Sequence, residues 1–309
     1  MKPALATLVD DVPSGGNWLF ETKFDGYRAL SAVSGSKVRI YTRSGLDWTD
    51  RFHAIADALA ELDLRGVLLD GEVVALDSAG RSSFSDLQKG LRSGGKNLSY
   101  FVFDLLAVRN KSIRSEPLSK RKARLKSLLK EAGREGPIFY TDHVNQDGAA
   151  MLEMVCRSGY EGIIAKRASA RYRSGRGRIW LKIKCGHEQE FVVVGWSPSQ
   201  KNRPFASLLL GVYEKGDLQY AGRVGTGFSQ DELQQLGARL NRLSRRTPPV
   251  TGGVPRAIAK DARWVTPQLV AQVAFTELTA DGLVRQARFL GLREDKPAEN
   301  VSWEESEAE

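Results

Sequence analysis

The sequence contains 309 residues, 41% of them hydrophobic and 27% charged, with a formal net charge of +9. This length suffices for two ordinary domains with separate cores, and no uncharged apolar run is long enough to predict a transmembrane helix. The first residues lack the apolar core of a signal peptide. The two cysteines, Cys156 and Cys185, lie far apart in the sequence, which argues against a disulfide framework and a structural zinc. We therefore expect a protein of the reducing cytoplasm.

The first two thirds of the chain alternate strand-like and helix-like segments. Short apolar runs rich in β-forming residues predict strands at 38–42, 67–76 and 100–106. Helical spacing predicts helices at 51–62 and 118–132. This mixture predicts an α+β domain.

The pattern changes after Glu190. Successive strands are predicted at 191–196, 207–213, 218–224, 270–277 and 282–288, with a hairpin turn at 215–217. A helix is predicted at 230–243, and a Pro/Gly-rich loop at 245–260. We therefore expect a domain boundary near residues 185–189 and a small β-barrel after it.

Acidic residues accumulate at the end of the chain. From Arg293 to Glu309 there are two basic and seven acidic residues, so residues 1–292 carry a net charge of about +14. A folded body this basic suits a polyanionic partner, of which nucleic acid is the usual example. Charge alone leaves open a basic protein without such a partner.

The most informative hexapeptide is Lys-Phe-Asp-Gly-Tyr-Arg at residues 23–28. A lysine beside a second cation is easier to deprotonate, and its neutral amine can attack an electrophilic phosphorus. Arg28 can supply that cation, and Gly26 permits a tight turn or a close approach of the backbone. On its own, however, the hexapeptide is better explained as an exposed charged turn.

Further charged motifs follow in order, each within or at the end of a strand-like segment: residues 43–45, 69–72, 101–104, 161–166 and 180–184. In the last motif, charged and apolar residues alternate. Because successive side chains of a strand point to opposite faces, we expect Lys182 and Lys184 on one side and Leu181 and Ile183 on the other. Charged side chains directed into one cleft suit nucleotidyl transfer. Lysines neutralise phosphates, carboxylates hold a metal ion or the ribose, and an aromatic face stacks on the base.

Together these motifs resemble those of the covalent nucleotidyltransferase superfamily, and most closely the ATP-dependent DNA ligase module of bacterial ligase D. The likeness runs from about Pro3 to Val301. It implies a nucleotidyltransferase (adenylation) domain of ATP-grasp-like antiparallel sheets with helices at 1–187. An OB-fold β-barrel is implied at 188–303, followed by an acidic tail at 304–309.

The resemblance also implies a role for each matching residue. Lys23 is expected to be the adenylylated nucleophile, Glu161 to bind the divalent metal, and Glu72 to contact the ribose and assist metal binding. The other expected nucleotide-binding residues are Glu21, Arg28, Arg43, Phe103, Lys166, Lys182 and Lys184. Among them, Phe103 is expected to stack on adenine and the lysines to contact phosphates. A purely structural role remains open for Glu21, Arg43 and Lys166.

Two stretches near the end depart from the family pattern. Gln272 stands where the family usually has glutamate, and residues 285–288 replace a usual Arg-His-Pro sequence. Residues 293–296 resemble the last motif, which is expected to orient the pyrophosphate leaving group. The departures concern the last contacts of the barrel and leave the chemistry of Lys23 unaffected.

Two basic stretches lie outside the nucleotide motifs. Residues 111–130 hold eight Lys or Arg against one Glu, mostly on a predicted helix, and are interpreted as a solvated helix face. Residues 171–178 are punctuated by glycine and predict a flexible loop. Its basic residues are expected to contact DNA phosphates: Arg171, Arg173, Arg176 and Arg178.

The sequence thus predicts an ATP-dependent DNA ligase that seals nicks or breaks in duplex DNA through a lysyl-AMP intermediate, with ATP and Mg²⁺ or Mn²⁺ as cofactors. The resemblance implies DNA repair by non-homologous end joining. The bacterial Ku end-binding protein and fused or associated polymerase and nuclease modules are the implied partners. We expect a monomer without membrane association.

Three alternatives remain. An RNA ligase and an mRNA-capping guanylyltransferase belong to the same superfamily, and a non-catalytic OB-type DNA-binding module belongs to a different class. An NAD-dependent ligase is disfavoured because only 22 residues precede Lys23 and zinc-binding cysteines are lacking. The same short segment leads us to expect no large DNA-binding domain before the core.

Overall fold

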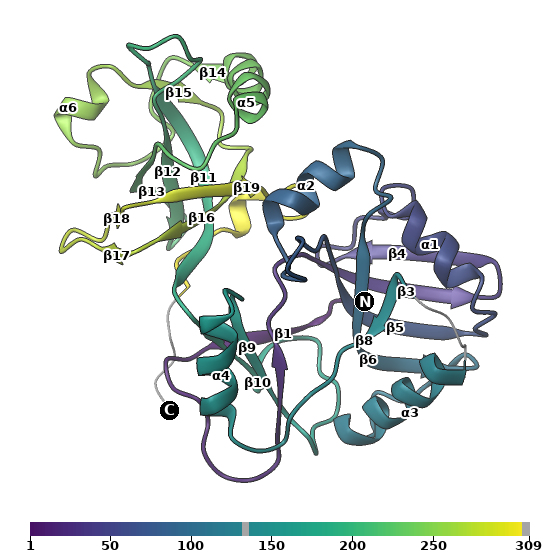
Figure 1. Cartoon of the computed structure of the whole chain (residues 1–309). Coiled ribbons are helices and arrows are strands. Elements are labelled where there is room, and N and C mark those ends of the chain that lie inside the picture. The colour runs from purple at the N-terminus through teal and green to yellow at the C-terminus, as the bar shows by residue number, and fades with distance from the viewer. Residues whose placement is uncertain (132–135, 305–309) are drawn as a thin grey trace. The chain divides into compact units, whose positions relative to one another are not determined.

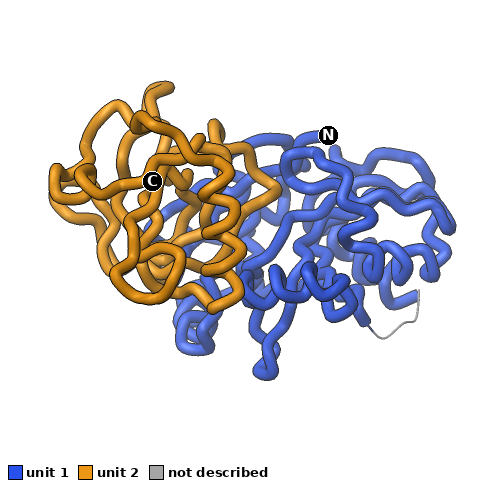
Figure 2. The backbone as a smooth tube through the Cα atoms, turned by 90° about the horizontal axis from the view of Figure 1, so that it is seen from above, with its two compact units in different colours: residues 1–185, 305–309 blue, residues 186–304 orange. Residues whose placement is uncertain are grey.

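The computed structural model describes residues 1–131 and 136–304, which form two compact units, one ending at Cys185 and one spanning Gly186–Glu304 (Figure 2). Residue 132 of the predicted helix and residues 305–309 of the expected tail lie outside the described residues. Within the described ranges, no helix is long and apolar enough to cross a membrane.

The larger sheet of the first unit has six strands in the order β4-β3-β5-β6-β7, with β8 paired to β6 (Figure 1). Its strands are β3 (Tyr27–Ser34), β4 (Lys37–Thr42), β5 (Val67–Val74), β6 (Ser99–Val108), β7 (Lys111–Ser112) and β8 (Ile138–Tyr140). Neighbouring strands are antiparallel except β8, which runs parallel to β6. The three strands predicted in this region are therefore present.

Three helices contribute to the core on one face of this sheet: α1 (His53–Ala60), α2 (Phe84–Arg92) and α3 (Leu118–Glu131). Their buried residues, among them Ile55, Phe84 and Leu125, form one core cluster with Tyr27 and Ala29 of β3. Because side chains alternate along a strand, Arg28 and Leu30 lie on the opposite face. That face is the one available for a binding site.

The second sheet of this unit has four strands in the order β1-β10-β9-β2. They are β1 (Ala4–Leu8), β2 (Trp18–Thr22), β9 (Gly162–Arg167) and β10 (Gly175–Lys184). The pair β1 and β10 is parallel, and the other pairs are antiparallel. The helix α4 (Gly148–Arg157) contributes Val155 to a core cluster with Phe20, Ile163 and Ile183 on one face of this sheet.

The prediction of a flexible loop at 171–178 is only partly correct. Strand β10 begins at Gly175, so Arg176 and Arg178 belong to a strand. Arg176 is paired with Leu5 of β1, and its Nη1 donates a hydrogen bond to the carbonyl oxygen of Ala6 over 2.7 Å. The glycines suggested flexibility, but pairing with the distant strand β1 provides hydrogen-bond partners for the backbone of this segment.

The structure contains a disulfide, so the prediction that the two cysteines do not form one is wrong. Cys156 at the end of α4 and Cys185 directly after β10 are joined by a disulfide, with their Cα atoms 5.3 Å apart. A separation of 29 residues in the sequence does not prevent contact because the chain returns to α4 through β9 and β10. Distance along the sequence was the wrong criterion.

The second unit is a closed five-stranded barrel. Its strands are β11 (His187–Ser197), β12 (Ser207–Glu214), β13 (Asp217–Val224), β16 (Val270–Phe275) and β19 (Arg288–Leu292). The strands β11, β12 and β13 pair in sequence order, while β16 pairs with both β11 and β19. A parallel bridge from Thr226 to Arg288 completes the ring. The predicted barrel is confirmed.

Short elements and one helix complete this unit. The hairpin between β12 and β13 turns at Lys215 and Gly216, both with positive φ, as the predicted turn requires. The helix α5 (Gln230–Arg242) begins with a capping box formed by Ser229 and Glu232. The remaining elements are β14 (Ser244–Arg245), β15 (Arg263–Val265), β17 (Glu277–Leu278), β18 (Val284–Arg285), α6 (Arg256–Ala259) and η1 (Ala298–Asn300).

The expected loop at 245–260 therefore contains a short helix, α6. Pro255 lies directly before its first residue and accepts hydrogen bonds from the backbone amides of Ile258 and Ala259. The proline that suggested a loop in fact stands at a helix start, where its missing amide hydrogen and fixed φ are compatible with the first turn.

Candidate active site

Two rows of residues cross the four-stranded sheet on one face. Paired residues on neighbouring strands point to the same side of a sheet. One row is Glu21, Ile164 and Lys182, and the other is Leu19, Lys166 and Trp180. The opposite face holds Leu181 and Ile183, which are buried in the core with α4 residues. The predicted alternation of residues 181–184 is therefore confirmed.

Lys23 lies at the end of β2, one residue beyond the strand. Its backbone amide donates to the carbonyl oxygen of Gly162 over 2.9 Å, and its Nζ forms an ion pair with Glu161. The side chains are 19% and 9% exposed, respectively. Gly26 follows, and a Cβ there would lie 2.3 Å from the carbonyl oxygen of Val73. Only glycine allows this approach, which keeps the Lys23 turn against β5.

Asp25 is a second carboxylate near Lys23. One of its oxygens and one oxygen of Glu161 lie within 4.8 Å of one another. Asp25 is also fixed by two hydrogen bonds, from its own amide to Ser82 Oγ and from the Phe84 amide to its carboxylate. Oxygen ligands of this kind are those that Mg²⁺ prefers, so the pair fits a divalent cation. The motif contained Asp25, but sequence reasoning did not assign it this role.

Arg28 and Glu72 are cross-strand neighbours on β3 and β5. The Arg28 guanidinium makes a bidentate ion pair with Asp70, over 2.5 and 2.8 Å, and Asp70 also accepts from the Tyr172 hydroxyl over 2.6 Å. Asp70 is fully buried. Although burial favours loss of the Arg28 proton, Asp70 raises the pKa of Arg28 above its ordinary value. Asp70 and Tyr172 were not recognised from the sequence, because their contact joins residues 102 positions apart.

Phe103 belongs to a buried cluster with Leu30 and Trp180 and is 7% exposed. Its ring meets the Trp180 ring edge to face, with centroids 5.9 Å apart. Two cations lie over the Phe103 ring: the Arg28 guanidinium at 4.5 Å from its centroid and the Lys166 ammonium at 3.9 Å. Phe103 therefore joins the two sheets and holds two of the predicted site cations.

Glu21 is buried between two lysines. Its Oε1 accepts from Lys122 and its Oε2 from Lys166, each over 2.6 Å. Burial opposes ionisation of Glu21, but the two ammonium groups hold its pKa below the ordinary value. Burial lowers the pKa of Lys166 to about 8, although Glu21 counteracts the shift. Lys166 thus contacts a carboxylate and two rings in this structure.

Lys122 corrects the interpretation of residues 111–130 as a solvated helix face. It lies on α3, is 1% exposed, and bonds Glu21. The buried residues of α3 are Leu118, Arg121, Lys122 and Leu125, which have the spacing of one helix face. This spacing was the signal that could have identified Lys122, but the charge of the residue concealed it.

Lys182, Lys184 and Arg43 are the remaining predicted nucleotide-binding residues. Lys182 and Lys184 are half-buried on β10, with Lys184 opposite Gly162 of β9. Arg43 is half-buried directly after β4. Of the predicted DNA-contacting residues, Arg171, Arg173, Arg176 and Arg178 are all exposed.

The last predicted motif lies in the barrel unit. Arg293 makes two hydrogen bonds of 2.9 Å with the Asp295 carboxylate, and Lys296 is 2.5 Å from Glu190. Gln272, the departure from the family pattern, donates to Glu188 over 2.6 Å. The basic residues of this motif are thus held by acids of the same unit.

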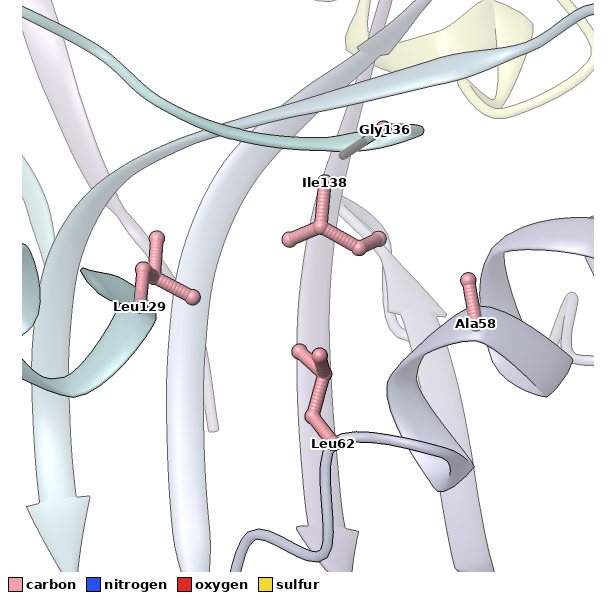
Figure 3. A pocket seen from close by; sticks show the side chains of 5 residues that line it. All are labelled: Ala58, Leu62, Leu129, Gly136 and Ile138. Carbon is pink, nitrogen blue, oxygen red and sulfur yellow. The ribbon is translucent and has the colours of Figure 1, made fainter. Parts of the chain in front are cut away.

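A pocket elsewhere in the first unit is lined by Ala58, Leu62, Leu129, Gly136 and Ile138 (Figure 3). Most of these side chains are apolar, and none of them belongs to the candidate site. We assign this pocket no role.

The first unit holds a partly exposed lysine just beyond a strand, and the second unit is a five-stranded barrel. This is the architecture of a covalent nucleotidyltransferase with an OB-fold unit. Residues 3–184 match the family described as the ATP dependent DNA ligase domain, and residues 201–296 match the ATP dependent DNA ligase C terminal region. The chain belongs to the family of ATP-dependent DNA ligases.

Several relatives are similar to most of this chain. The multifunctional non-homologous end joining protein LigD of Pseudomonas aeruginosa is 41% identical over 98% of the chain, and that of Mycolicibacterium smegmatis is 34% identical over 93%. The chain spans 36% and 37% of their lengths. A structure of mycobacterial DNA ligase D complexed with ATP and MES is 34% identical, with a TM-score of 0.70 over 96% of this chain and 97% of that one. The ligase domain of LigD from M. tuberculosis is also 34% identical, with a TM-score of 0.54 over 98% of both chains.

Proposed function

We propose that Lys23 is the nucleophile of this ligase and carries the adenylyl group. The observation that supports this most strongly is its position directly after β2, where its side chain is partly exposed and ion-paired with Glu161. An amine that is accessible yet anchored through its backbone to Gly162 can be presented to ATP in one orientation.

The first chemical step forms a bond between Lys23 Nζ and the α-phosphorus of ATP. The bond from that phosphorus to the oxygen bridging to the β-phosphate breaks, and pyrophosphate leaves. The amine must lose its proton to solvent first, and release of its ion pair with Glu161 makes that loss easier. The 5′-phosphate of DNA then displaces Lys23 from the phosphorus to give a DNA-adenylate. Finally, the 3′-hydroxyl attacks that 5′-phosphate, and AMP leaves.

The remaining residues are proposed to hold the nucleotide. Glu21 accepts a hydrogen bond from the base, and Phe103 lies against it, with the base taking the place of one of the cations over the ring. Glu72 and Arg28 contact the ribose, and Lys182 and Lys184 the phosphates. Arg43 and Lys166 complete the set, with Lys166 also balancing the charge of Glu21.

Glu161 and Asp25 would hold a divalent cation, with Glu72 assisting. When bound, Mg²⁺ or Mn²⁺ supplies positive charge that stabilises negative oxygens on the phosphates. The proposal is supported by the close approach of the Asp25 and Glu161 carboxylates. Glu161 must then exchange its ion pair with Lys23 for the cation, which would leave the amine available for attack.

We also propose that this ligase takes part in the repair of broken DNA. The similar LigD proteins are named for non-homologous end joining. This supports duplex DNA with nicks or breaks as the substrate, and a bacterial Ku protein and polymerase and nuclease modules as partners. The exposed arginines at 171, 173, 176 and 178 would contact DNA phosphates. Ligation of linear DNA by the isolated chain, with and without Ku, would test this role in repair.

Intact-mass spectrometry after incubation with ATP and magnesium tests the nucleophile. The wild-type chain should gain one adenylyl group, and Lys23→Arg should gain none, because a guanidinium keeps the charge but offers no neutral amine. An ATP-derived phosphoramidate on Lys23→Arg would refute the assignment. Joining of nicked DNA but not of nicked RNA would separate a DNA ligase from the RNA-ligase alternative.

A further inference from the structure

Lys122 makes contacts that its position on a basic helix did not predict. Its ammonium donates to Glu21 Oε1 over 2.6 Å, to the Thr141 carbonyl oxygen over 2.9 Å and to the Phe103 carbonyl oxygen over 3.5 Å. An ammonium has three hydrogens to donate, and three acceptors surround this one. Lys122 therefore connects α3 to the two residues proposed to contact the base, Glu21 and Phe103.

The geometry of Glu21 limits what it can recognise. Each carboxylate oxygen already accepts from one lysine, but each has a second lone pair that remains able to accept another hydrogen bond. An ionised carboxylate has no hydrogen to donate. Where such a group faces position 6 of the base, it accepts from the exocyclic amine of a 6-aminopurine and repels the carbonyl oxygen of a 6-oxopurine. The two lysines thus maintain the protonation state that distinguishes these bases.

The two lysines differ in their other contacts. The Lys166 ammonium lies over the rings of Phe103 and Trp180, at 3.9 and 4.2 Å from their centroids, and so borders the proposed base site itself. Lys122 lies over Tyr140, at 4.7 Å, and bonds backbone carbonyls. The contact of Lys122 with Phe103 is to the backbone carbonyl oxygen at 3.5 Å, whereas its contact with Glu21 is to the side chain at 2.6 Å. Glu21 is therefore the side chain through which Lys122 acts on the base.

We propose that Lys122 is a positioning residue for base selection: it holds the Glu21 carboxylate ionised and fixed in orientation, so that the site takes a 6-aminopurine nucleotide in preference to a 6-oxopurine. This inference rests on the proposed role of Glu21 in contacting the base. It assigns the selectivity of the adenylylation step to a residue on α3, outside the collinear nucleotide motifs.

ATP and ITP provide a suitable pair of probes because their bases differ only in the group at position 6 and in the hydrogen that the 6-oxopurine carries on N1. The quantity to measure is kcat/KM for formation of the covalent lysyl-nucleotide with each. Lys122→Met removes the charge but keeps much of the side-chain volume. It should lower the ATP-to-ITP ratio of kcat/KM by about ten-fold or more, because charge-assisted hydrogen bonds fix the orientation of the acceptor. Lys122→Arg should retain most of the ratio.

The matched control is Lys126→Met, on the same helix. Lys126 is exposed and pairs with Asp142, so its loss should leave the ratio unchanged. A purely structural role for Lys122 would lower kcat/KM for both nucleotides equally, in proportion to a fall in Tm. An unchanged ratio in a folded Lys122→Met protein would overturn the proposal.

Two further variants separate the inference from its premise, and Lys122→Gln, which also removes the charge, replaces Lys122→Met where that variant does not fold. Glu21→Gln alone should lower the ratio, and adding Lys122→Met to it should lower the ratio no further, because Lys122 acts through Glu21. A further fall in the double variant would overturn the inference alone. An unchanged ratio in Glu21→Gln would instead refute the proposed base contact of Glu21, and with it the premise.

Discussion

Lys23 and Glu161 form an ion pair that joins the end of β2 to the start of β9. The same two segments are joined by the hydrogen bond from the Lys23 amide to the Gly162 carbonyl oxygen. The backbone bond fixes the position of the lysine, whereas the ion pair involves the group proposed to react. The two contacts can therefore be separated by mutation.

Glu161→Gln should slow lysine adenylylation by about a hundred-fold, because it removes a proposed ligand of the cation that stabilises negative charge on the phosphates. The magnesium concentration for half-maximal rate should also rise. Measurement of adenylylation rate against magnesium concentration checks both effects. Glu153→Gln on α4, an exposed residue paired with Arg157, is the control. Equal magnesium dependence in wild type and Glu161→Gln would remove the metal assignment.

Asp70→Ala should lower the free energy of unfolding by about 3–5 kcal/mol, because it leaves the partly buried Arg28 guanidinium without its counter-charge. Urea denaturation at neutral pH measures this. The comparison variant is Glu153→Ala, which breaks an exposed pair and should change stability by less than about 0.5 kcal/mol. Similar small effects for both variants would show that Arg28 finds other partners or water.

The pKa of Lys166 leads to a prediction about stability and pH. Because burial lowers this pKa to about 8, from an ordinary 10.5, the folded chain loses this proton at lower pH than the unfolded chain. Between about pH 8 and 10.5 the unfolded state therefore binds more protons, and this group alone makes stability rise with pH.

The Tm of wild type and Lys166→Met, measured across that window, checks the prediction. Methionine removes the titrating group. The difference between the wild-type Tm and the Tm of the variant should therefore shift in favour of the wild type as pH rises. A constant difference between the two curves would show that Lys166 titrates as it does in the unfolded chain.

Arg173→Ala combined with Arg176→Ala should weaken binding to nicked DNA and flatten its salt dependence. The logarithm of affinity falls with the logarithm of salt at about 0.9 per contacted phosphate, so each lost contact should reduce the slope by about one. Binding measured between low and moderate salt tests this. Lysine adenylylation, which needs no DNA, should be nearly unchanged.

The control for this experiment must avoid Lys122, which is buried and bonded to Glu21. Lys120→Ala with Lys126→Ala changes two exposed residues of the same helix. This pair should alter the slope less than the arginine pair does. If the helix pair proves equally damaging, the DNA path crosses α3 instead of residues 171–178.

The residues of the site could be predicted to different degrees. Lys23, Glu161 and Lys182 could be predicted as site residues because their motifs are short and occur in a fixed order. The alternation of residues 181–184 follows from strand geometry alone. Lys122 was misread because charge is usually a sign of exposure. Its helical spacing with Leu118 and Leu125 indicated burial, but the sequence did not show that Glu21 would neutralise it there.

The sequence by itself determined several strands and helices, the two-unit organisation of an α+β region before a barrel, and the hexapeptide around Lys23. These follow from local periodicity, turn chemistry and motif order, which need no knowledge of distant neighbours. Only the tertiary structure decided that Cys156 reaches Cys185, that Arg176 joins a strand with β1, and that Asp70 holds Arg28. Each of these contacts joins segments remote in the sequence, and the packing of whole sheets, not local propensity, brings such segments together.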